Sequence, residues 1–92
     1  MDLDLAARRL EAIGNPMRLR IYLALGEAGA GGLAVGTLQQ RVGLRAPSTL
    51  SHHLHRLIEA GIVSQERSAT TLICRVDTDA LKGILGLLSE FR

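Results

Sequence analysis

The chain has 92 residues and a formal net charge of +2, and its length fits one domain spanning residues 1–92 rather than two. Hydrophobic residues make up 47% of it, with only Tyr22 and Phe91 as aromatics, so the core must be aliphatic, and its one cysteine excludes an intrachain disulfide. Because a chain this short buries only about 60–65% of the surface that its unfolded form exposes, we expect a second copy to bury more.

The first part of the chain predicts two helices. Leu3 to Ile13 carries apolar residues at helical spacing, and Gly14 is expected to end this helix. Asn15 can cap the next helix, and Pro16 suits its first turn. That second helix is apolar around much of its circumference, so we expect it in the centre of the fold, ending before the glycine-rich break at residues 29–32.

The middle of the chain predicts a helix-turn-helix. Leu33–Val35 is a very short strand or the approach to a third helix, which covers about Val35 to Val42. Gly43–Ala46 forms a turn, and Pro47 opens a fourth helix that runs to about Ala60. Its buried face is predicted from the i, i+4, i+7, i+8 spacing of Leu50, Leu54, Leu57 and Ile58, and Gly61 is expected to end it in a left-handed conformation.

A β-hairpin and a last helix complete the predicted fold. Ile62–Gln65 and Leu72–Val76 are β-prone runs, and the polar segment Glu66–Thr70 between them is expected to form an exposed turn. Asp77 is expected to cap a final, strongly apolar helix that ends near Leu88. The fold class is therefore mainly α with a small β-hairpin wing, a winged helix-turn-helix in the order α-α-α-α-β-β-α, dimeric through its first and last helices.

The fourth helix carries the features of a recognition helix. In a helix-turn-helix, the N-terminal residues of the second helix contact base edges in the major groove. The face opposite the leucines presents Ser48, Ser51, His52 and His55, with Thr49 and Arg56 on its flanks. These hydroxyls, imidazoles and the guanidinium can bond phosphates or bases, and no acid precedes Glu59, so DNA recognition is favoured over an incidental polar face.

Positive charge is concentrated in the same region. Residues 41–75 hold five arginines, two glutamates and all three histidines, which suits contact with a polyanion. Arg67 and Arg75 of the hairpin can lie along the DNA backbone or reach the minor groove, although an ordinary surface hairpin explains them equally well.

Two segments resemble the signatures of the ArsR/SmtB family of bacterial winged-helix repressors. They are Asn15–Ile21 on the second helix, and Ser48–Leu54 with Leu57 and Glu59–Val63 around the recognition helix. The resemblance implies a homodimer built from the first and last helices, and binding to double-stranded operator DNA that blocks transcription. It also implies that Ser48, Ser51 and His52 read bases. One departure is Ala46, which stands where the family commonly has a capping serine, and alanine caps poorly.

The family is known for metal sensing, but the sequence predicts no metal site and no cofactor. Leu33–Leu38 lacks the Cys-x-Cys of one sensing motif, and the last helix has Asp77 and Asp79 but no histidine. The three histidines of the recognition helix do not make up for this, because adjacent residues on a helix point roughly 100° apart.

The sequence leaves open the role of Cys74 and the signal, if any, to which the regulator responds. Cys74 is either a small apolar strand residue or a redox sensor whose oxidation disturbs the wing. The sequence neither supports nor excludes a small-molecule effector in an apolar pocket at the dimer interface.

The sequence favours a DNA-binding transcriptional regulator over the other classes. The alternative is a winged-helix module for protein interaction or dimerisation, without specific DNA binding. No nucleophile–base pairing, phosphate-binding glycine motif or carboxylate pair points to an enzyme. The acidic N-terminus is unlike a signal peptide, and no apolar run approaches the roughly 20 residues that span a bilayer, so we expect a cytoplasmic protein without membrane association.

Overall fold

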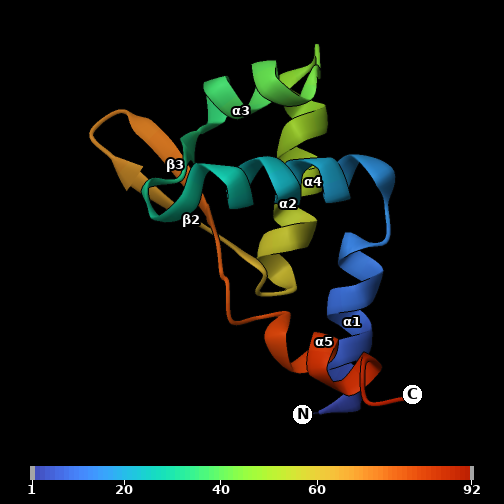
Figure 1. Ribbon diagram of the computed structural model, residues 1–92. Coiled ribbons are helices and arrows are strands. Elements are labelled where there is room, and N and C mark those ends of the chain that lie inside the picture. The colour runs from blue at the N-terminus through green and yellow to red at the C-terminus, as the bar shows by residue number, and fades with distance from the viewer. Residues whose placement is uncertain (1, 92) are drawn as a thin grey trace.

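The computed structural model describes residues 2–91 and has the predicted winged helix-turn-helix fold (Figure 1). In chain order, the elements are α1 (Leu3–Ile13), α2 (Pro16–Ala28), the 3-10 turn η1 (Gly29–Gly31), β1 (Leu33–Ala34), α3 (Val35–Val42), α4 (Pro47–Glu59), β2 (Val63–Ser68), β3 (Thr71–Val76) and α5 (Lys82–Leu88). The molecule measures 45 × 23 × 21 Å, and Figure 1 shows α1 and α5 together at one end, with α3 and the hairpin towards the other.

The helix boundaries follow the capping residues that the sequence indicates. The Asn15 side chain accepts hydrogen bonds from the backbone N–H groups of Met17 and Arg18, at 2.9 and 3.1 Å, and so caps α2. Gly43 after α3 and Gly61 after α4 have φ values of +76° and +78°, a conformation that glycine adopts without steric cost. The predicted ends of these helices are confirmed.

The sheet has three strands, because the Leu33–Val35 segment, expected to be either a very short strand or the approach to α3, provides β1, which joins the predicted hairpin. Leu33 of β1 pairs with Cys74, and the strand order is β1-β3-β2, all antiparallel. The expected turn over Glu66–Thr70 is wrong, because β2 continues to Ser68, which pairs with Thr71, and only two residues form the tip. Polar residues can continue β2 because all of its residues after Val63 are exposed. An exposed strand does not need alternating polar and apolar residues.

The last helix begins later than predicted. Asp77 does not cap it: its backbone N–H bonds the Ile62 carbonyl at 3.0 Å, and its carboxylate accepts from the N–H of Asp79 at 3.0 Å. These bonds hold Asp77 in a turn at the end of the sheet, so that α5 starts only at Lys82 and has no side-chain cap.

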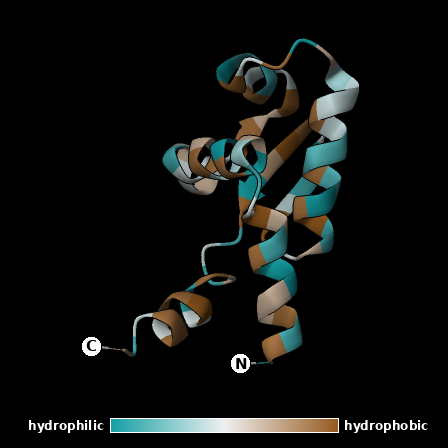
Figure 2. Ribbon diagram, turned by 90° about the vertical axis from the view of Figure 1, so that its right-hand side faces the viewer, coloured by the Kyte–Doolittle hydropathy of each residue, from teal (hydrophilic) through white to brown (hydrophobic). Residues whose placement is uncertain are grey.

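The core is aliphatic and lies between α2, α3, α4 and the sheet. Its largest fully buried side chains are Ile21, Leu25, Leu38, Leu50, Leu57 and Ile62, joined by Cys74. By contrast, large apolar side chains of α1, α5 and the C-terminal segment remain exposed, namely Leu3, Leu10, Leu85, Leu87, Leu88 and Phe91. Leu19 and Leu23 of α2 are exposed as well, so α2 is buried on one side only and not around much of its circumference as predicted. Figure 2 shows hydrophobic residues along much of α5. Across residues 2–91, no helix combines the length and apolar character needed to cross a membrane.

Candidate nucleic-acid interface

The turn between α3 and α4 fixes where the recognition helix begins. The N–H of Gly43 bonds the carbonyls of Gln39 and Gln40, and the Gln39 side chain donates to the Arg45 carbonyl at 3.1 Å. Ala46 stands at the N-cap of α4 and provides no side-chain acceptor, as its residue type dictates. The N–H groups of the first turn of α4 are therefore not capped by a side chain, an arrangement that suits contact with a phosphate.

The buried leucines orient α4 so that its polar face points away from the core. Leu50, Leu54 and Leu57 are at most 2% exposed, as predicted, whereas Ile58, also predicted on the buried face, is only partly buried. On the helix, Ser48, His52 and His55 lie opposite these leucines. Ser51 lies on the side towards the hairpin, and Thr49 and Arg56 lie on the other side; all six of these polar residues are exposed.

The acidic groups near this face are paired. Glu59, in the last turn of α4, lies 3.0 Å from Nε2 of His55. Glu11 of α1 lies 3.4 Å from the Arg56 guanidinium, so Arg56 bridges α4 to α1. The N-terminal half of α4 remains free of carboxylates, which makes it the part of the helix best suited to approach DNA.

A cleft of about 190 Å³ separates α4 from the hairpin. Ser51 and His55 border it on the helix side, and Gln65 and Leu72 border it on the hairpin side. Arg67 pairs with Leu72 and, two residues after Gln65, lies on the same face of the ribbon. The structure thus brings Arg67 to the side of the hairpin that faces the recognition helix.

Arg75 lies on the opposite face of the ribbon. Arg75 pairs with Ser64, and successive residues of a strand point to opposite faces. Its side chain therefore points away from the face that carries Gln65 and Leu72. Its Nε donates to the Ala30 carbonyl at 2.9 Å, and its Nη1 donates to the Glu66 carboxylate at 2.6 Å. The two hairpin arginines of the predicted site are therefore not brought together.

Cys74 is fully buried in the middle of β3. Burial raises the pKa of its thiol, and a hydrogen bond from the Gln65 side chain, 3.5 Å from Sγ, opposes that rise. Because the thiolate is the reactive form, this environment favours the structural role of Cys74 over the redox role.

His53 lies beside the polar face, on the side towards α2. Its Nδ1 is buried and has no hydrogen-bond partner within the described residues. Burial lowers its pKa, and the charges of Arg18 and His52 lower it further. Within residues 2–91, no three His, Cys, Asp or Glu side chains are grouped so as to hold a metal ion.

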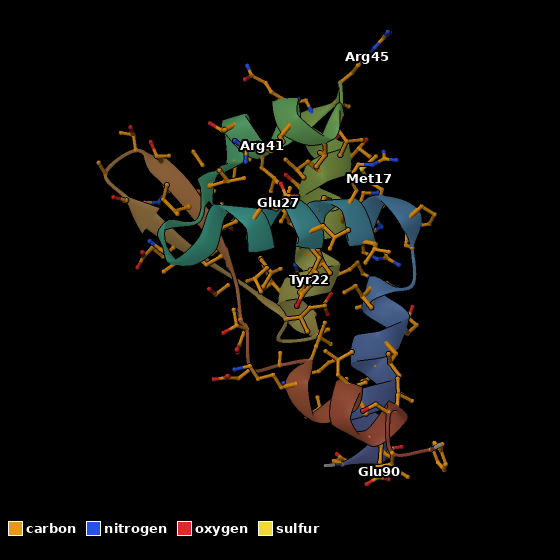
Figure 3. All side chains as sticks on the ribbon, viewed as in Figure 1. Met17, Tyr22, Glu27, Arg41, Arg45 and Glu90 are labelled. Carbon is orange, nitrogen blue, oxygen red and sulfur yellow. The ribbon has the colours of Figure 1, made fainter. Side chains whose placement is uncertain are left out.

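Two arginines that the sequence reasoning did not assign to the site belong to the helix-turn-helix, one on α3 and one in the turn before α4. Arg45 extends from the α3–α4 turn away from the body of the protein, and Arg41 projects from α3 (Figure 3). Both are exposed. The concentration of arginines after residue 40 was the signal that could have identified them.

Comparison with known proteins agrees with this geometry. Residues 13–66 match the family model of a helix-turn-helix domain. Nodulation protein NolR of Rhizobium meliloti is 40% identical over 89 residues, which cover 97% of this chain and 70% of NolR. The crystal structure of NolR from Sinorhizobium fredii, also 40% identical, superposes with a TM-score of 0.74 over 96% of this chain and 84% of that one.

A second solved structure carries the family name. It is the homodimeric winged helix-turn-helix DNA-binding domain of Mb0332 from Mycobacterium bovis, a possible ArsR-family transcriptional regulator. It is 28% identical, with a TM-score of 0.77 over 94% of this chain and 76% of that domain. With the family-like signatures on α2 and α4, these matches show that the chain belongs to the ArsR/SmtB family of winged helix-turn-helix transcriptional regulators.

Proposed function

We propose that this protein is a homodimeric, single-domain repressor of the cytoplasm that binds operator DNA without catalysing a reaction. In this proposal, Ser48, Ser51 and His52 read base edges. A larger set contacts phosphates or the groove walls, namely Thr49, His55, Arg56, Arg67, Arg41 and Arg45. Repression follows from occupancy of a promoter, as the family resemblance implies.

The exposed N-terminal half of α4 carries this proposal. Burial of the leucines on the other face of α4 turns its hydroxyls and imidazoles towards solvent, and no carboxylate precedes Glu59 in the helix. Small side chains such as Ser48 and Ser51 allow the helix backbone to approach the bases closely. Arginines on α3, the turn and the hairpin surround this surface and supply attraction to phosphates that does not depend on sequence.

The dimer is proposed from the exposed leucines of α1 and α5. These helices lie side by side at one end of the molecule in Figures 1 and 2, away from α3. Leu3 is 69% exposed and Leu85 is 64% exposed, which is a large apolar surface for so small a chain. Association of two such ends buries that surface, and the solved domain of Mb0332 is itself homodimeric.

Fluorescence anisotropy with labelled DNA tests the proposal. DNA from upstream of the chain's own gene should bind more tightly than a shuffled duplex of equal length, and affinity should fall steeply between about 50 and 200 mM salt. Light scattering on the same samples should give the mass of a dimer. Equal affinity for both duplexes would overturn base reading, whereas a dimer without DNA affinity would support the protein-interaction module instead.

A further inference from the structure

A cavity of about 300 Å³ lies between the C-terminal end of α2, the 3-10 turn and the base of β3. Leu25 and Val76 provide aliphatic walls, and Gly26, Gly29 and Ala30 leave the space open. A Cβ atom added at Gly26 would meet no atom within 4 Å. The volume falls at the lower end of the range for small-molecule sites, which are mostly apolar with a few polar groups.

One charged side chain, that of Arg75, lines this cavity, and the Thr78 hydroxyl is its other polar side-chain group. Nε and Nη1 of Arg75 are bonded to the Ala30 carbonyl and the Glu66 carboxylate. Nη2 has no acceptor within residues 2–91, so it can still donate two hydrogen bonds. A guanidinium beside aliphatic walls is suited to a carboxylate that carries a hydrocarbon group.

We propose that this α2–β3 cavity binds a small apolar carboxylic acid. Its carboxylate pairs with Arg75, and its hydrocarbon part packs against Leu25 and Val76. Ser51 and His55 do not line this cavity, and Arg75 lies on the opposite face of the hairpin from the cleft that they border, so the acid does not block the recognition helix directly.

The bound acid acts on the hairpin through Arg75. This arginine ties β3 to β2 through Glu66 and to the 3-10 turn through Ala30. The Arg75–Glu66 pair is neutral, and a bound carboxylate gives the cluster a net negative charge at the base of the wing. This effect rests on the proposed function: we expect the acid to lower operator affinity about fivefold or more, within the usual range of allosteric coupling.

Isothermal titration calorimetry with octanoate and phenylacetate tests the cavity, and the corresponding uncharged amides serve as matched ligands. The wild-type protein should bind at least one of the acids and neither amide. Gly26→Leu fills the cavity and should abolish binding, and it should fold because leucine favours a helix more than glycine does. Arg75→Gln should weaken binding at least tenfold. Gly36→Leu on α3, another helical glycine with open space around its Cβ position, should bind like the wild type.

The outcomes separate this inference from the proposed function. If neither acid binds the wild-type protein, or if the Gly26→Leu variant binds as well as the wild type, the α2–β3 cavity is not the site. Operator binding measured without any acid remains a separate result, which stands or falls on its own. Acid binding that leaves operator affinity unchanged would overturn the effector role.

Discussion

At the scale of single residues, Arg67 and Arg75 carry the same charge on neighbouring strands but occupy opposite faces of the hairpin. Arg67 lies on the side of the recognition helix, whereas Arg75 is held by Glu66 and Ala30. We therefore expect Arg67→Ala to weaken binding to operator and shuffled DNA alike, and to reduce the salt slope by about 1. Arg75→Ala is the matched variant, and it should change the salt slope less.

His52→Ala should behave differently from Arg67→Ala in the same anisotropy titrations. Loss of a base contact relaxes preference at one operator position by about 1–3 kcal/mol and leaves affinity for shuffled DNA almost unchanged. An equal loss on both duplexes in the His52 variant would show that this side chain contacts phosphate rather than a base.

His53 makes stability depend on pH. Burial, Arg18 and His52 lower its pKa below the ordinary value of 6.5, so the folded protein binds this proton less tightly than the unfolded chain does. The contribution of His53 to the free energy of unfolding should be constant above pH 6.5. It should fall as the pH drops from 6.5 through the lowered pKa, because the unfolded chain then binds the proton more tightly. Urea titrations across that range should show a fall that is smaller in His53→Gln. Ser51→Ala, which removes no titratable group from α4, should keep the wild-type fall.

At the scale of elements, Arg9 connects three segments that are distant in the sequence. From α1, its Nε donates to the Ala60 carbonyl at the end of α4, and its Nη1 donates to the Ala80 carbonyl before α5. A cation at a helix C-terminus is also favoured by the helix dipole. Arg9→Met should lower the free energy of unfolding by about 1–2 kcal/mol, since two partly buried bonds to a charged donor are lost.

Urea denaturation of the Arg9 variant needs a matched control from the same helix. Arg8 is exposed and makes no hydrogen bond within the described residues, so Arg8→Met removes the same charge without those contacts. Equal stability of the two variants would show that Arg9 does not hold α1, α4 and the turn before α5 together.

Elements with local signals were predictable from the sequence, and those set by tertiary contacts were not. Asn15, Gly43, Gly61 and the leucine spacing of α4 act within a few residues, so these helix ends and the outward polar face could be found by pattern. The sequence leaves Leu33–Val35 open between a very short strand and the approach to a helix, because the third strand depends on Leu33 pairing with Cys74, 41 positions later. The start of α5 depends on the bond between Asp77 and Ile62, and the separation of Arg67 from Arg75 depends on the strand register. Such long-range pairings leave no periodicity in a single sequence.

At the scale of the whole molecule, the long axis separates the exposed leucines of α1 and α5 from α3 and the hairpin (Figure 1). A single recognition helix offers few base contacts, so high operator affinity requires two copies that bind half-sites about one helical turn, or about 34–36 Å, apart. Affinity and dimerisation should therefore be lost together when the apolar end is changed.

Leu85→Glu tests this dependence, because it places a charge on a side chain that is 64% exposed in the single chain and buried in the proposed dimer. Light scattering should give a monomer, and anisotropy should show operator affinity reduced at least about 100-fold, the usual gain from joining two binding modules. Ser89→Glu adds the same charge to the end of α5 without removing apolar surface, and should remain a dimer. A Leu85→Glu protein that stays dimeric would place the contact between protomers elsewhere, and a monomer with wild-type affinity would show that one recognition helix suffices.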